Sequence, residues 1–251
     1  MSVASLVVAC PWPDPAGHVS PEGITFVGAT PFRGAAAPPP WHCRHTVLLV
    51  WADPDKNEEQ SPFIWKEAGY EADDEKVEDR CSIAFELEGK FDSDMKAGIE
   101  SKWDVWEWCA ARSNPTGFGF DRTHIYSKTA PQAPIKARRL TDRAGNQIFF
   151  WHPHDTGTPC FKTVTLPETK GAPVVLQFPT QTPTGSAADV QAKGVWAAGK
   201  WTVEFKRKLS TGNKDDTVLV AGKSVGIAVA TFDKSEKGDH DVTKHVVLKL
   251  Q

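Results

Sequence analysis

The sequence predicts an all-β protein, an antiparallel β-sandwich with long loops and a few short helices. Short segments alternate apolar and polar residues, which is the pattern of a strand with one buried face. Turn-forming residues are frequent, with 19 Gly and 19 Pro, and no long segment has the periodicity of a helix. The chain has 251 residues, 40% of them hydrophobic, which is enough for one large core. We therefore expect a single domain over residues 1–251.

The N-terminal segment contains two expected strands. Residues 6–10, Leu-Val-Val-Ala-Cys, resemble a lipoprotein cleavage site, but no basic region precedes them, so we expect residues 1–10 to form the first strand. Residues 11–41 are rich in Pro and Gly, which favours extended loops around a short strand at Ile24–Val27. We expect residues 1–41 to pack on the domain.

Three strands are expected in the next part of the chain. The nearly continuous apolar run His45–Trp51 indicates a strand that is buried on both faces. Cys81–Glu88 alternates, which indicates a strand with one wet face. Trp103–Trp108 alternates as well and places Trp106 and Trp108 on the same face.

The following segments mix loops and short strands. We expect a long loop over 113–140, a strand at Gln147–Trp151, and a flexible loop over 180–188. The last apolar segments of the chain are also expected to be strands: Thr217–Val220, Val225–Phe232 and His245–Leu250.

Residues 189–209 predict two strands joined by a tight turn. The apolar residues of each strand alternate, and the turn signal Ala-Ala-Gly at 197–199 lies between them. Lys193 is a basic residue inside the first of these strands. Without further information it reads as a solvent-exposed strand lysine.

Composition and missing motifs exclude several classes of function. The net charge of −3 argues against a general nucleic-acid binder. The five cysteines form no Cys-x-x-Cys pair, which excludes a zinc ribbon and thioether-bound haem. No apolar run is long enough for a membrane span, and the common hydrolase, kinase and nucleotide-binding motifs are missing.

Two motifs point to a family. Glu78-Asp79-Arg80 is followed by an alternating strand, by Trp106-Glu-Trp108 and by Ala111 and Pro115. The second motif, over 189–209, reads Asp-x-x-Ala-x-x-x-Trp-x-x-Gly-x-Trp-x-Val-x-x-x-Arg-x-Leu. From Val47 to the C-terminus the chain thus resembles the haem-binding domain of the ethylbenzene dehydrogenase family, which includes the γ subunits of dimethylsulfide dehydrogenase and of chlorate and selenate reductases.

The resemblance implies a β-sandwich that binds a b-type haem without covalent bonds. It also implies an electron-transfer subunit with no chemistry of its own, which relays electrons to or from a molybdenum and iron–sulfur oxidoreductase. The implied partners are a molybdopterin catalytic subunit and an iron–sulfur subunit, or a soluble cytochrome. Because the respiratory relatives work in the periplasm, we expect a periplasmic location.

The resemblance also implies two axial ligands for the haem iron, a methionine and a lysine. The methionine corresponds to Met95, which lies in a polar loop shortly before the Trp106-Glu-Trp108 strand. The lysine corresponds to Lys193, although a register two residues earlier would place Gln191 at that position on the same strand face. A thioether ligand raises the reduction potential of the iron. A lysine binds iron only as the neutral amine, so its pKa must be lowered by burial.

Further residues are expected around the haem. Arg207 is a candidate partner for a haem propionate. Large aromatic side chains are expected to line the pocket: Trp106, Trp108, Trp196 and Phe205.

Two alternative functions come from other classes. The sandwich also resembles the family-9 carbohydrate-binding modules and DOMON domains. Exposed members of the set Trp103, Trp106, Trp108 and Trp196 could bind a sugar. A small metalloenzyme could use the loop His152–Asp155, with His45 or His124 as a distant ligand. Met95 discriminates among these functions, because a sugar-binding module has no use for a methionine in its loop.

Overall fold

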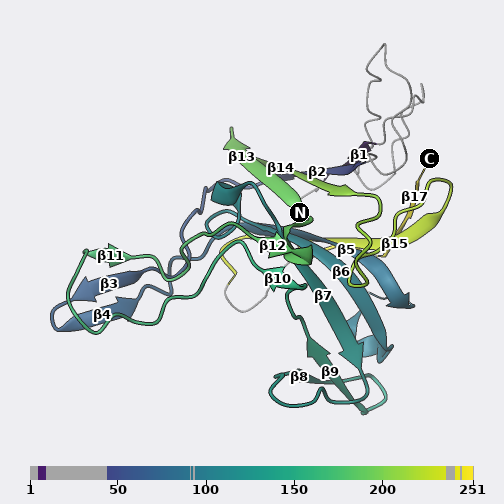
Figure 1. Cartoon of the computed structure of the whole chain (residues 1–251), viewed down its shortest axis with the longest axis horizontal. Coiled ribbons are helices and arrows are strands. Elements are labelled where there is room, and N and C mark those ends of the chain that lie inside the picture. The colour runs from purple at the N-terminus through teal and green to yellow at the C-terminus, as the bar shows by residue number, and fades with distance from the viewer. Residues whose placement is uncertain are drawn as a thin grey trace, which may run out of the picture.

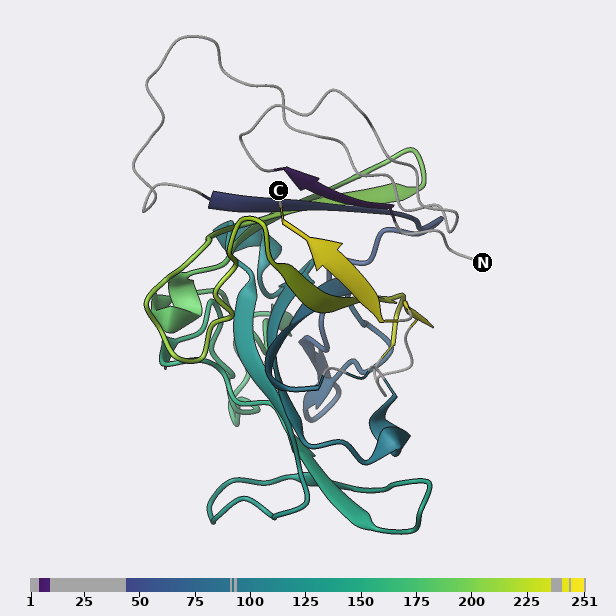
Figure 2. The ribbon, with the colours of Figure 1, turned by 90° about the vertical axis from the view of Figure 1, so that its right-hand side faces the viewer.

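A computed structural model describes residues 5–9, 44–90, 92, 94–235, 241–243 and 245–250. Two antiparallel sheets stack on each other in the described part of the chain (Figures 1 and 2). The four-stranded sheet has the order β1-β2-β14-β13, and the large sheet has the order β16-β15-β5-β6-β7-β9-β8, with β17 also paired to β15. This arrangement confirms the predicted all-β sandwich.

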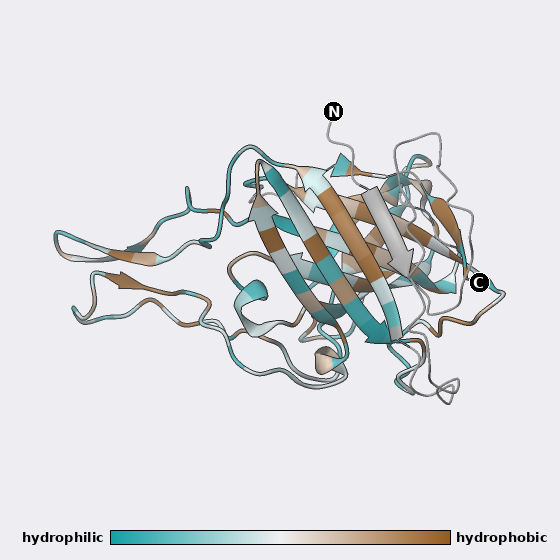
Figure 3. Cartoon of the chain, turned by 90° about the horizontal axis from the view of Figure 1, so that it is seen from above, coloured by the Kyte–Doolittle hydropathy of each residue, from teal (hydrophilic) through white to brown (hydrophobic). Residues whose placement is uncertain are grey.

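The four-stranded sheet contains the strands of the 189–209 motif. Its bounds are β1 Ser5–Ala9, β2 Arg44–Ala52, β13 Gln191–Ala197 and β14 Lys200–Lys208. The turn between β13 and β14 is made by Ala198 and Gly199, both with positive φ, as the turn signal predicted. Buried and exposed residues alternate along β13 and β14, and Figure 3 shows the same alternation in hydropathy.

The large sheet curls beneath the four-stranded sheet (Figure 2). Its strands are β5 Arg80–Gly89, β6 Ser101–Cys109, β7 Phe120–Ser127, β8 Arg138–Thr141, β9 Gln147–Trp151, β15 Ser224–Phe232, β16 Asp241–Val242 and β17 Val246–Lys249. The expected strands at 81–88, 103–108, 147–151, 225–232 and 245–250 are therefore confirmed.

Two smaller sheets lie beside the sandwich. β3 Phe63–Lys66, β4 Gly69–Ala72 and β11 Val174–Val175 form an arm that projects sideways (Figure 1). β10 Gly157–Thr158 pairs with β12 Thr184–Gly185. In the described residues the helical elements are three short 3₁₀ turns: η2 Met95–Ala97, η3 Asn114–Thr116 and η4 Ser186–Ala188.

The main core lies between the two stacked sheets. β2 and β14 contribute apolar side chains from above, and β5, β6 and β15 contribute them from below. The largest of these buried side chains are Trp106, Trp108 and Trp201, together with Phe85 and Phe205. Burial of this apolar area is the main force that holds the two sheets together.

Three sequence predictions about local structure are wrong. The segment 113–140 is not one long loop, because it contains β7 and the start of β8. Thr217–Val220 forms no strand. β2 is not buried on both faces, since Val47, Leu49 and Trp51 are buried whereas the residues between them are only half-buried. The expected strand Ile24–Val27 lies outside the described residues.

Candidate functional site

A cavity of about 280 Å³ lies on the face of the large sheet that points away from the four-stranded sheet. Its floor is formed by strands β5, β6, β7 and β15, and β9 and η2 close its sides. The side chains that define its chemistry are Arg80, Met95, Trp103, Glu107, Arg122, His124, Tyr126, Arg138, Phe150 and His152.

Strand alternation explains how two central strands supply this face. On β6, Trp106 and Trp108 point into the core, so Trp103, Val105 and Glu107 point into the cavity. Trp103 lies opposite His124 of β7 in the strand register. The same strand thus contributes to the core with one face and to the cavity with the other.

Aromatic rings form the apolar wall of the cavity. The Tyr126 ring lies 4.8 Å from the Trp103 ring and 4.6 Å from the Phe150 ring, and it stacks on the latter. Met95 packs against the same apolar cluster. The wall is therefore aromatic, apolar and polarizable, which suits a hydrophobic ligand.

Met95 is held in place by its own loop. Asp94 caps the η2 turn by accepting a hydrogen bond from the Lys96 backbone N–H, and it forms an ion pair with Arg143. The Arg143 backbone N–H donates to the Lys96 carbonyl over 3.0 Å. The loop with Met95 is thus fixed to the turn between β8 and β9, and the thioether is presented at the cavity.

Two histidines bring imidazole nitrogens to the same cavity. The ring centres of His124 and His152 are 5.6 Å apart, and each ring also contacts Phe150. Burial lowers the pKa of His124 to about 3, and the charges of His152 and Arg122 act in the same direction. The His124 imidazole is therefore neutral at physiological pH, as a metal ligand must be.

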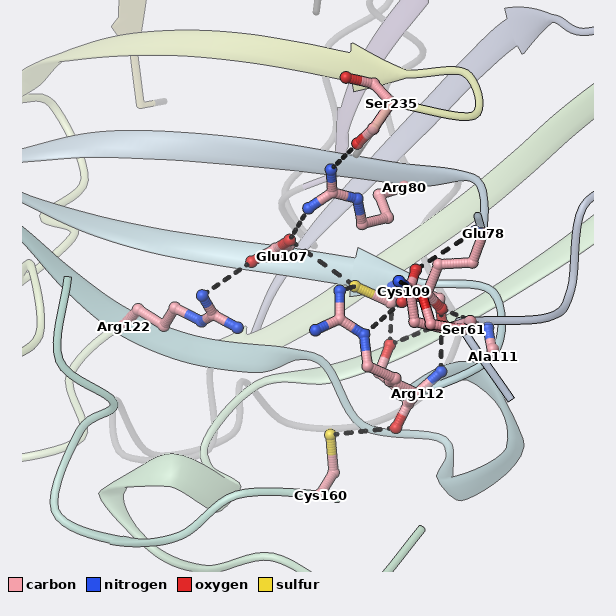
Figure 4. A network of polar contacts seen from close by, with 12 residues as sticks. Ser61, Glu78, Arg80, Glu107, Cys109, Ala111, Arg112, Arg122, Cys160 and Ser235 are labelled. Carbon is pink, nitrogen blue, oxygen red and sulfur yellow. Dashed lines mark hydrogen bonds and ion pairs between the residues drawn. The ribbon is translucent and has the colours of Figure 1, made fainter. Parts of the chain in front are cut away.

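Three arginines and one glutamate set the charge at the cavity. Glu107 forms ion pairs with Arg80 over 3.3 Å and with Arg122 over 3.4 Å (Figure 4). Burial raises the pKa of Glu107, but the charges of Arg122 and Arg80 outweigh this effect and lower it to about 2. The third arginine, Arg138, is exposed at the rim. The cavity keeps a net positive charge beside its apolar wall.

Lys193 does not reach this cavity. It lies on β13 in the four-stranded sheet, and its Nζ donates to the Asn114 carbonyl over 2.9 Å. Gln191, the same-face alternative, lies on the same strand. The structure therefore does not bring Met95 and either of these residues to a common cavity.

The aromatic residues that the resemblance implies around a haem do not line this cavity. Trp106, Trp108 and Phe205 are buried between the two sheets, because alternation turns them away from the cavity. Trp196 lies at the edge of the core and donates through Nε1 to the Asp53 carbonyl over 3.0 Å. Trp103 is the tryptophan among the cavity-lining residues.

Arg207 is fully buried and bonded to the protein. Its Nη1 contacts Asp104 and Asp216, each over 2.6 Å, and its Nη2 donates to the Thr217 carbonyl over 2.7 Å. An arginine in this position neutralises carboxylates of its own chain. It is not among the residues that line the cavity.

The residues of the His152–Asp155 loop diverge. His152 faces the cavity, whereas the His154 ring packs against Phe120 and Phe161. Asp155 accepts a hydrogen bond from the Thr123 hydroxyl over 2.9 Å. Within the described residues, this loop does not gather two histidines and a carboxylate around one point.

Sequence reasoning missed Arg122, His124 and Tyr126 as cavity residues because it missed β7. The segment Thr-His-Ile-Tyr at 123–126 has β-branched and aromatic residues, which was the available signal for a strand. The charged residues around it weaken the alternation. His124 was considered only as a distant ligand for the His152–Asp155 loop, and Tyr126 was not considered.

The described part of the chain contains no helix that is long and apolar enough to cross a lipid bilayer. A search of the curated proteins finds no match to this chain. The family model described as "Ethylbenzene dehydrogenase" matches residues 45–244, which is well over half of the chain and includes the whole cavity. The chain belongs to the ethylbenzene dehydrogenase family.

Proposed function

We propose that this chain is a b-type haem-binding, electron-transfer subunit of a complex related to ethylbenzene dehydrogenase. The observation that carries the proposal is the cavity in which the Met95 thioether and the imidazoles of His124 and His152 lie beside an aromatic wall. Its partners would be a molybdopterin catalytic subunit and an iron–sulfur subunit, or a soluble cytochrome, in the periplasm. Family membership supports a partner from a molybdoenzyme complex.

The residues of the cavity fit a haem in two respects, an apolar wall and a cationic group at the rim. The wall of Trp103, Tyr126 and Phe150 offers apolar area to a macrocycle. The volume of about 280 Å³ lies below the range that begins at roughly 300 Å³ for ligand pockets, so a macrocycle would extend past the exposed residues at the rim. Arg138 at that rim is a suitable partner for a propionate.

The donor set favours Met95 and His124 as the residues that hold the iron. Met95 lines the cavity, and burial keeps the His124 imidazole neutral, with a pKa of about 3. His152 is the second candidate imidazole, but it is more exposed. Lys193 contacts Asn114 in the other sheet, so a role as ligand would require that contact to break. A haem held by thioether and imidazole supplies one-electron transfer at a raised potential.

The protein's own groups would control the surroundings of the cofactor. Glu107 neutralises part of the charge of Arg80 and Arg122, so the cavity is only moderately positive. The aromatic wall excludes water from one side. These two effects set the polarity around the iron, and polarity is one of the factors that tune a reduction potential.

The test is a titration of the purified chain with haemin, followed by visible spectroscopy of the ferric and ferrous forms. We expect a low-spin, six-coordinate spectrum in the wild type. Met95→Leu and His124→Phe are each expected to give a high-spin spectrum, whereas Lys193→Ala is expected to leave the spectrum unchanged.

The variants separate the possible ligand sets. If Lys193→Ala gives a high-spin spectrum and His124→Phe keeps the wild-type spectrum, Lys193 rather than His124 is the axial ligand. If only His152→Ala gives a high-spin spectrum, His152 rather than His124 is the imidazole ligand. A wild type that binds no haemin would contradict the proposed function.

A further inference from the structure

A second cluster of ionisable groups lies on the opposite face of the large sheet from the cavity. Asp104 of β6 and Asp121 of β7 point inward, and Asp216 approaches them from the connection between β14 and β15. One carboxylate oxygen from each of the three lies within 4.8 Å of the others. Asp155 and Asp215 form a second such group with Asp216, so the five carboxylates are contiguous.

The hydrogen bonds of the cluster leave several oxygens unused. Oδ2 of Asp104 accepts from Arg207 and from the Thr217 backbone N–H, but its Oδ1 has no hydrogen-bond partner among the described residues. Neither carboxylate oxygen of Asp121 has one, although Asp121 is only 1% exposed. Oδ2 of Asp155 also lacks one.

A buried carboxylate without a hydrogen-bond partner lowers the stability of the folded state. Removing a carboxylate from water without a hydrogen-bond partner costs several kcal/mol, on the order of the whole stability of a small protein. Arg207 provides one positive charge against five carboxylates. The remaining negative charge must be neutralised by protons or by a cation.

We propose that this cluster binds a divalent cation of the hard, oxygen-preferring class, and that Ca²⁺ is its occupant. Asp104, Asp121 and Asp216 would be the central ligands, with Asp155 and Asp215 at the side that opens to solvent. Several carboxylates from separate segments suit the irregular, high coordination number of Ca²⁺ better than the strict octahedron of Mg²⁺.

The site would have a structural role. Asp216 lies in the connection between β14 and β15, and Asp215 accepts hydrogen bonds from Ser186 and Thr156. Asp121 and Asp104 belong to the large sheet. One ion would therefore tie the loops around residues 155, 186 and 215 to two strands whose other face forms the cavity.

The Trp106 ring can report an ion bound in the acidic cluster through sensitised emission. The Arg207 guanidinium that bonds to Asp104 lies 4.6 Å from the centre of that ring. Terbium(III) binds calcium sites and emits when a nearby tryptophan is excited. The full chain, freed of metal with EDTA, is titrated with terbium(III) and then with Ca²⁺, and its melting temperature is measured with and without Ca²⁺.

We expect tryptophan-sensitised emission that Ca²⁺ displaces. We also expect the melting temperature to rise by about 5–10 °C when Ca²⁺ is in hundredfold excess over its dissociation constant. Asp121→Asn should lose both effects. This variant removes a buried carboxylate that has no hydrogen-bond partner among the described residues, so it should fold in EDTA and melt no lower than the wild type. The matched control Asp74→Asn, at an exposed site in the arm, should keep both effects.

If Asp121→Asn does not fold, Asp155→Asn provides the same comparison. A wild type with no displaceable emission and no rise in melting temperature would overturn the proposal and leave protons as the neutralising charge. The same conclusion follows if Asp121→Asn and Asp155→Asn respond to Ca²⁺ like the wild type. Haem binding does not enter the measurement, so a colourless protein that binds Ca²⁺ would leave this inference intact.

Discussion

Arg207 is a fully buried cation between two carboxylates. It follows the inward residues Val203 and Phe205 of β14 at intervals of two, so alternation alone places it inside. The expectation of a propionate partner came from the family resemblance. The structure instead assigns its charge to Asp104 and Asp216.

We predict that Arg207→Met destabilises the protein by about 3–5 kcal/mol, because it leaves buried carboxylates without their positive partner. Urea denaturation followed by tryptophan fluorescence measures the change. Lys208→Met, at the exposed neighbouring position, is the control and should change stability by less than about 0.5 kcal/mol. Equal effects of the two substitutions would contradict the assigned role of Arg207.

Asp79 is a second buried charged group, and it couples stability to pH. Its Oδ2 accepts hydrogen bonds from the Asn57 N–H and from Nε1 of Trp201. Burial raises the pKa of Asp79 to about 7, against the lowering effect of these bonds. The folded state thus holds this proton at higher pH than the unfolded chain, whose Asp pKa is about 4. The stability that the proton confers is full below pH 4 and is lost as the pH rises through about 7.

We predict that the wild type loses about 1 kcal/mol more stability between pH 6 and pH 8 than Asp79→Asn does. The asparagine keeps an oxygen acceptor for the Trp201 indole and has no proton to lose. Urea denaturation at the two pH values gives both losses, and other titrating groups cancel in the comparison. Identical losses in the two proteins would show that Asp79 does not titrate between these pH values and would contradict the prediction.

At the scale of elements, β13 can pack over β6 only because residue 194 is a glycine. A Cβ on Gly194 would lie 2.3 Å from a ring carbon of the buried Trp108. Asn114 bonds to the backbone of Gly194 on both sides, since it accepts from the N–H over 2.8 Å and donates to the carbonyl over 3.3 Å. The close approach explains why a small residue stands between Lys193 and Val195 in the middle of a strand.

Gly194→Ala is therefore expected to cost about 1–3 kcal/mol, the usual range for overpacking a core. Thermal or urea denaturation measures the loss. Gly69→Ala is the matched control on β4, where an added Cβ meets nothing within 4 Å. A variant at Gly194 that is as stable as the one at Gly69 would mean that β13 and β6 can move apart freely.

The strands with clean alternation were predictable, and those with charged residues on their apolar face were not. β5, β6, β14 and β15 follow the pattern, and the turn after β13 has its expected residues. β7 was missed because Arg122 and His124 occupy cavity positions that would normally be apolar. Of the site, Met95 was identified through the family resemblance, whereas His124 depends on a strand that periodicity does not reveal.

At the scale of the whole molecule, the two faces of the large sheet have different tasks. One face packs against the four-stranded sheet and carries the core and the acidic cluster, and the other carries the cavity. Of the tryptophans considered for sugar binding, Trp103, Trp106 and Trp108 are buried and Trp196 is half-buried, so the set forms no exposed platform. This arrangement favours a ligand enclosed against the large sheet.

The central claim is that the chain binds a b-type haem in this cavity. The most direct measurement is the visible spectrum of the full chain purified from haem-replete cells, before and after reduction with dithionite, for the wild type and Met95→Leu. We predict a Soret band and sharp α and β bands on reduction in the wild type, and a high-spin spectrum without sharp bands in Met95→Leu. A colourless wild type, or a coloured one whose spectrum Met95→Leu leaves unchanged, would contradict the claim.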